Sequence, residues 1–236
     1  MSVTMIDVII YIVSMMLIAG YHVFLRIRTR RDSSYTIQSI NNMARSAWVD
    51  NIMSDRSNGL LAVQTLRNST MAATFLASTA ILMSVGVLNL MEKDEAKTGL
   101  FNYLHGSGLH SNIISSAGFM NEKLLILLIT FIWAFFCFSM AVRMYNHVGY
   151  LINSKNTRLQ FMPSPKYVSK LLNRSGKYYS YGMRAYYISI PMIFSLYDPY
   201  FMLIASIGVI KLLYYIDRAP QHDMDKTAEA REHGKE

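Results

Sequence analysis

The sequence predicts an all-α fold: an integral membrane bundle of four transmembrane helices, with amphipathic helices at its cytoplasmic face. Three observations predict it. Of the 236 residues, 52% are hydrophobic and 16% are charged, whereas a typical soluble domain has about 25% charged residues. Several apolar stretches are long enough to cross a ~30 Å hydrocarbon core as helices. The basic residues gather in alternate connections between those stretches, as they do in membrane proteins.

Four stretches are predicted to span the membrane. Residues 5–25 contain one acidic residue, Asp7, and are followed by an arginine cluster typical of a cytoplasmic boundary. Residues 69–90 and 124–142 contain no charged residue, and the second of these is the strongest apolar stretch in the chain. Residues 199–215 form the predicted fourth span. We therefore treat residues 1–217 as a single membrane domain and 218–236 as a polar C-terminal tail.

The first amphipathic helix is expected between the first two spans. Apolar residues recur there at spacings of three and four from Ile37 to Ile52, which is the pattern of a helix with one apolar face. The connection after the third span, residues 143–187, has eight basic residues and no acidic one, and a short helix at 167–172 is expected to rest on lipid headgroups.

The apolar stretch at residues 186–216 is too long for one upright span. Pro191 and Pro199 are the expected breaks, because proline lacks the backbone donor that a helix interior needs. We predict an amphipathic approach helix that ends near Tyr197, followed by the fourth span.

The charges predict the orientation of the spans. Residues 26–68 carry a balance of +4 and residues 143–187 of +8, whereas residues 91–123 carry −1 and residues 217–236 carry −2. Since basic loops stay in the cytoplasm, four spans with both termini outside the cytoplasm are expected. Anionic lipid headgroups are expected partners of the basic face.

Polar residues gather on the entrance and one side of the second span, where small residues also recur and favour close helix packing. Two further candidates are His22, at the inner end of the first span, and Asp198, at the break before the fourth. Asp198 is hypothesised to pair with Arg67. The candidate functional residues are Gln64, Arg67, Asn68, Thr70, Thr74, Ser78, Asp198 and His22.

No catalytic, cofactor-binding or metal-binding signature is present in the sequence. There is no HExxH motif, no CxxC motif and no glycine-rich phosphate loop, and Cys137 is the single cysteine. We therefore expect no catalytic residue, cofactor or metal. Nucleic acid is not an expected partner, because the basic residues flank apolar spans instead of forming a folded basic domain.

Four segments carry a resemblance to a known family. They are the pair Tyr21-His22, the run AVQTLRNSTMAATFLASTAIL from residue 62, Arg143 with YNHVGYLIN, and YVSKLLNRSGKYYSYGMRAYYISIP from residue 167. Over residues 21–217 the chain resembles the bacterial and plant membrane family called domain of unknown function 599. The resemblance implies a multi-pass membrane protein without an assigned activity, so no functional residue is carried over from it. With this resemblance, a bacterial inner membrane is the expected location.

Three classes of function remain open. The first is a structural or assembly protein, either a homo-oligomer or an accessory subunit of a membrane complex, which small residues on the second span favour. The second is an oligomeric channel or carrier for a small solute or ion, whose path the polar face of that span would line. The third is a metal-dependent membrane enzyme. An enzymatic role is left open, and a non-enzymatic one is favoured.

Overall fold

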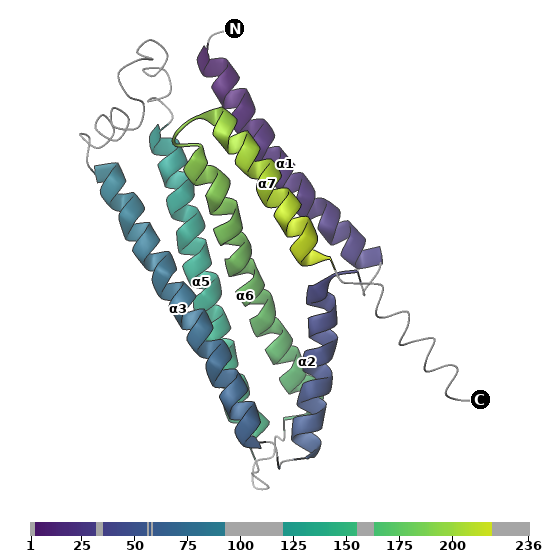
Figure 1. Cartoon of the computed structure of the whole chain (residues 1–236). Helices are drawn as coiled ribbons and strands as arrows, with labels where there is room; N and C mark the ends of the chain where they lie inside the picture. Colours follow the sequence, from purple (N-terminus) through teal and green to yellow (C-terminus); the bar gives the residue numbers. More distant parts are fainter. Residues whose placement is uncertain are drawn as a thin grey trace.

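The computed structural model describes residues 3–31, 35–55, 57, 59–92, 120–154 and 163–218. The described residues form six helices that run lengthwise through an elongated bundle (Figure 1). The predicted tail lies outside the described residues except for Arg218, and so does most of the loop after the second predicted span. The helices are α1 (Val3–Arg31), α2 (Ile37–Ser54), α3 (Gly59–Glu92), α5 (Met120–Ile152), α6 (Pro165–Phe194) and α7 (Pro199–Asp217).

The all-α prediction is confirmed, and so are four helices that are long and apolar enough to cross a membrane. These are residues Val8–Arg31 of α1 and the whole of α3, α5 and α7. Helices α1, α3, α5 and α7 each contain one of the four predicted spans. The chain is therefore a multi-pass membrane protein. Because α3 starts ten residues before its predicted span and α5 ends ten residues after its own, both helices extend well beyond the apolar stretches.

Three long helices, α3, α5 and α6, form the body of the bundle. Small side chains let α3 approach α5 closely: Ala77 and Ala80 of α3 pack in one buried cluster with Ala134 of α5. One turn further along α5, in the same cluster, Phe138 is fully buried, and a Cβ added at Gly182 of α6 would lie 2.7 Å from its ring. The absence of a side chain at Gly182 therefore sets how closely α6 can approach α5.

Helix α6 corrects the prediction for residues 165–197. The structure has neither a separate short helix at 167–172 nor a break at Pro191, which lies inside α6. The helix runs antiparallel to α5 along its whole length: Val168 packs near Ile152 at one end, and Met192 packs near Leu124 at the other. Buried small residues spaced along α6 make this long contact with α5. One continuous helix also pairs more backbone N–H and C=O groups in hydrogen bonds than two shorter helices would.

The expected break before the fourth span is present at Asp198. The chain turns over residues 195–198, and Asp198 caps α7 by accepting a hydrogen bond from the Tyr200 N–H at 2.8 Å. Ser195 lies beside the start of α5, where Lys123 donates to its carbonyl oxygen at 2.8 Å. We call this end of the bundle, where α1 begins, α3 ends and α5 begins, the far end (Figure 1).

Helix α7 packs against α1 and runs in the same direction (Figure 1). Tyr21 of α1 donates to the Asp217 carboxylate at 3.0 Å, and Thr36 forms an isolated β-bridge with Arg218. Val3 therefore lies at the far end, whereas Asp217 lies near the end of α1, partway along the bundle (Figure 1). The start of α1 and the end of α7 are thus apart along the bundle, because α6 returns the chain to the far end before α7 starts. That both termini lie outside the cytoplasm stays a prediction.

Helix α2 confirms the predicted amphipathic helix and packs against the first half of α6. That half of α6, together with the matching halves of α3 and α5, extends past the ends of α1 and α7 (Figure 1). We call this end of the bundle the basic end. Val49 and Ile52 of α2 are buried, whereas Met43, Ala44 and Ala47 are exposed. The buried side of α2 is thus narrower than its apolar pattern predicted.

Candidate functional site

The polar residues predicted on α3 lie along its outward side. Gln64, Arg67, Asn68, Thr74 and Ser78 are exposed, and Thr70 is half-buried. The opposite side of the helix, with Ala62, Leu66, Ala73, Ala77 and Ala80, is buried in the bundle. The structure therefore brings the predicted α3 residues together on one face, and this face points away from the other helices. We call these six polar residues the α3 face.

The polar groups of the α3 face differ in their hydrogen bonding. Thr70, Thr74 and Ser78 each donate to the carbonyl oxygen four residues earlier, at 2.9, 2.9 and 3.1 Å. Such bonds satisfy a hydroxyl within its own helix. Gln64 and Asn68 make no side-chain hydrogen bond within the described part of the chain, and both could donate to and accept from a partner.

The hypothesised pairing of Asp198 with Arg67 is wrong. Asp198 caps α7 at the far end, whereas Arg67 lies on the part of α3 that is near the basic end (Figure 1). The hypothesis assumed that the approach helix stays at the cytoplasmic face. Since α6 instead runs to the far end, it carries Asp198 there. The role of Asp198 in the structure is that of a helix cap.

His22 belongs to a polar junction between α1, α6 and α7. Asp217 accepts from Tyr21 at 3.0 Å and from Arg184 at 3.0 Å. His22 lies beside Tyr21 with its ring edge-on, and its Nδ1 is placed to donate to the Ile18 carbonyl oxygen at 3.0 Å. Its Nε2 is buried without a hydrogen-bond partner in the structure. This junction ties the three helices together at one level of the bundle.

Sequence reasoning found only part of this junction. It selected His22 but not Arg184 or Asp217, because Arg184 was counted among the cytoplasmic basic residues and Asp217 among the charges of residues 217–236. A usable signal was present: an acidic residue directly at the end of an apolar span needs a partner or water. Arg184 could not be chosen as that partner without knowing that α6 runs beside α7.

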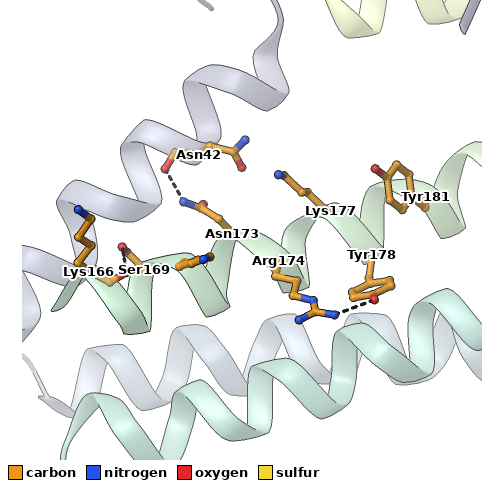
Figure 2. Close-up of a pocket in the computed structure, with 9 residues that line it drawn as sticks. Asn42, Lys166, Ser169, Asn173, Arg174, Lys177, Tyr178 and Tyr181 are labelled. Atoms are coloured by element: carbon orange, nitrogen blue, oxygen red, sulfur yellow. Dashed lines mark hydrogen bonds between the residues drawn. The ribbon is translucent and has the colours of Figure 1, made fainter. Parts of the chain in front are cut away.

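A basic groove lies between α2 and α6 and was not predicted as a site. It has a volume of about 670 Å³, which is within the usual range of small-ligand sites. Figure 2 shows its residues and the hydrogen bond from Asn173 to the backbone oxygen of Asn42, at 3.1 Å. The lining residues are Asn42, Lys166, Ser169, Lys170, Asn173, Arg174, Lys177, Tyr178 and Tyr181.

The groove is strongly positive. Four of its nine lining residues are cationic, at spacings of four, four and three along α6, and none is acidic. Such spacings place side chains on one side of a helix. Arg174 is held in place by Tyr178, whose hydroxyl accepts from it at 3.5 Å and whose ring lies 5.8 Å from its guanidinium carbon. The arrangement suits a ligand with negatively charged oxygens.

Arg45 adds a fifth positive charge next to the groove. Its guanidinium donates to the Asn42 side chain at 3.2 Å, and a Cβ added at Gly176 would collide with it. Burial lowers the pKa of Arg45, but an arginine remains protonated at neutral pH. No carboxylate forms an ion pair with Arg45 among the described residues. Its charge therefore adds to that of the groove instead of being neutralised.

Within the described ranges, no three histidine, cysteine, aspartate or glutamate side chains gather as they would around a metal ion. Cys137 is fully buried in α5. Two arrangements of polar groups among the described residues could bind a partner or a ligand. They are the α3 face and the basic groove.

Comparison with protein families gives one match. The family model described as "Protein of unknown function, DUF599" matches residues 9–222. Comparisons with curated proteins and with solved structures found no match.

Proposed function

We infer the role of this chain, which belongs to the DUF599 family of unknown function, from its own geometry. We propose that it is a membrane protein of the assembly type, which self-associates through the α3 face. The observation that carries the proposal is that α3 packs chiefly against α5 and leaves its other side open. That open side is where the predicted polar residues lie.

The exposed side of α3 combines groups that favour helix association. Gln64 and Asn68 have free hydrogen-bonding capacity, and side-chain amides bond across helix interfaces in membranes. Large apolar residues lie among them: Phe75 is 70% exposed and Leu82 is 66% exposed. Contact with a second copy of α3 would bury both kinds of group. An accessory role in a larger membrane complex would use the same face with another partner.

A channel or carrier is the second candidate. The observation that favours it is the line of polar groups from Gln64 to Ser78 on one side of α3, which several copies around an axis would turn toward a shared path. Within one copy, the largest fully buried side chains are apolar, among them Phe138, Leu124 and Met202. A path would therefore require an oligomer. A metal-dependent enzyme gains no supporting observation from the described residues.

Cysteine cross-linking tests the proposed contact. In a Cys137→Ala background, Thr74→Cys and Ser78→Cys place single thiols on the α3 face, and Ile132→Cys places one on the exposed side of α5 as the matched control. In membranes treated with an oxidant, we expect a covalent dimer for the α3 variants and little for the control. Equal cross-linking at all three positions, or a monomeric mass in lipid nanodiscs, would overturn the proposal.

The proposed location is a bacterial inner membrane with the basic end in the cytoplasm. Support comes from the arginine cluster at the end of α1 and the four cations of the groove on α6, which lie toward the same end of the bundle. In this orientation the start of α1 is outside the cytoplasm and the end of α7 is inside. This proposal differs from the expectation that both termini are outside.

A further inference from the structure

The groove between α2 and α6 has the chemistry of an anion site and the position of a lipid site. We propose that it binds the headgroup of an anionic phospholipid from the leaflet at the basic end. Lys166, Lys170, Arg174 and Lys177 supply the charge on α6, and Arg45 adds to it from α2. Charge-assisted hydrogen bonds from such groups to phosphate oxygens are short and strong.

The exposed residues of α6 change character at the upper limit of the groove. Up to Tyr181 they are mostly basic or polar, whereas Ile190, Ile193 and Phe194 are exposed on the part that runs toward the far end. An exposed apolar surface of this kind suits contact with acyl chains. The change therefore marks the level at which hydrocarbon gives way to headgroups, and the groove begins on the headgroup side of it.

Two features near this level support a boundary between hydrocarbon and headgroups there. Tyr178 and Tyr181 line the upper part of the groove, and tyrosine is enriched where membrane meets water. One turn further along α6, Arg184 is paired with Asp217 at the end of α7. Since α7 is one of the apolar spans, its last residue lies close to the membrane boundary. A headgroup at this level can enter the groove while its acyl chains stay in the bilayer.

The groove also suits the apolar part of a lipid. The aliphatic stems of its lysines and the rings of its tyrosines provide apolar surface beside the charges. Its volume of about 670 Å³ has room for a phosphate and the glycerol backbone attached to it. A soluble phosphate compound shares only the charged part of this chemistry, so the lipid is the ligand that the position and lining favour.

The binding test uses the full-length protein, delipidated in a neutral detergent. Native mass spectrometry follows the binding of phosphatidylglycerol and, for comparison, phosphatidylcholine. The groove variant is Lys166→Gln/Lys170→Gln/Lys177→Gln, and the control variant removes the same charge at the end of α1, as Arg26→Gln/Arg30→Gln/Arg31→Gln. All six side chains are exposed, so both variants are expected to fold. Circular dichroism and the melting temperature check this.

We expect the wild-type protein to prefer phosphatidylglycerol. Because three cationic partners of the phosphate are removed, the groove variant should bind it roughly 100-fold more weakly, and the control variant should bind it nearly as the wild type does. Equal losses in both variants, or no preference over phosphatidylcholine, would overturn the proposal. Displacement of the lipid by equal concentrations of glycerol phosphate would also overturn it, by showing a site for a soluble phosphate.

A second measurement needs no variant. Hydrogen exchange of the wild-type protein is compared in nanodiscs of phosphatidylcholine with and without phosphatidylglycerol. A lipid bound between α2 and α6 should slow exchange at residues 38–50 and 166–181 and leave residues 120–142 of α5 unchanged. Uniform exchange in the two membranes would contradict a lipid in the groove.

Discussion

At the scale of single residues, the least ordinary feature is the ion pair between Arg184 and Asp217. Both side chains are largely buried, with 20% and 16% of their surfaces exposed. The carboxylate also accepts from Tyr21. A buried carboxylate needs such partners, because removing it from water is costly. The pair therefore links the end of α7 to α6 and to α1, three elements that are distant in sequence.

Breaking this pair should destabilise the protein. Asp217→Asn and Arg184→Gln each remove a charged hydrogen bond, and each should cost about 2 kcal/mol of unfolding free energy. The double variant should cost little more than either single one, because the second change removes a partner that has already lost its contact. Thermal unfolding in detergent measures all three. Strict additivity would show that the two groups do not interact.

Asn173 is a second residue on which a helix contact depends. Its side-chain amide donates to the Asn42 carbonyl oxygen and to the Ser46 hydroxyl, both at 3.1 Å. We expect Asn173→Ala to loosen α2 from α6 and to speed hydrogen exchange of α2 backbone amides by about tenfold, the effect of roughly 1.4 kcal/mol. Asn146→Ala, at an exposed site on α5, is the control. Unchanged exchange in α2 would contradict this role.

At the scale of the helices, contact between α5 and α6 depends on small residues. Gly182 lies against the fully buried ring of Phe138, which Tyr179 and Tyr186 of α6 also contact. Tyr186 in turn donates to the Leu76 carbonyl oxygen of α3 at 2.6 Å. The three long helices are thus joined around one aromatic cluster, and a larger residue at Gly182 would push α6 away from it.

Gly182→Ala tests this packing. The added Cβ has no room beside Phe138, so we expect a loss of about 2 kcal/mol and a melting temperature lower by about 6 °C. Gly208→Ala is the matched control, because a Cβ at Gly208 of α7 meets no atom within 4 Å. Alanine is the better helix former, so the control should be neutral or slightly stabilising. If both variants melted alike, close packing at Gly182 would not be limiting.

At the scale of the whole molecule, the direction of α7 decides the arrangement of the chain in the membrane. Helices α1, α5 and α7 run one way, and α3 and α6 run the other (Figure 1). With α1, α3, α5 and α7 as spans, α6 has to carry the chain back to the far end. Its exposed residues Ile190, Ile193 and Phe194 are suited to lipid contact there. We therefore predict that the chain crosses the membrane an odd number of times.

Reporter fusions test this arrangement. Alkaline phosphatase is active only outside the cytoplasm, and a fluorescent protein folds well only inside it. We expect a phosphatase joined at residue 1 to be active and one joined at residue 236 to be inactive, with the opposite result for the fluorescent protein. The physical reason is that a polar tail follows α7 and remains on the side where α7 ends. Two termini on the same side would refute the arrangement.

The sequence by itself determined the class of the protein, its four apolar helices, the amphipathic helix α2 and one of its two candidate sites. Composition and apolar length are local properties, so they identified α1, α3, α5 and α7 and the break at Asp198 without any tertiary information. Helical spacing likewise placed Gln64, Arg67, Thr70, Thr74 and Ser78 on one face of α3.

Only the tertiary structure decided how the helices are paired. Pro191 and the basic residues of α6 made that helix look like two short surface segments, and a local pattern cannot show that small residues such as Gly182 are held against Phe138. This contact carries α6 back along α5, and the direction of α7, the separation of Asp198 from Arg67, and the pairing of Arg184 with Asp217 all follow from it. The basic groove needs the same contact, because it forms only where α2 packs beside α6. Packing between distant segments depends on their shapes in three dimensions, which the order of apolar and polar residues along one chain does not specify.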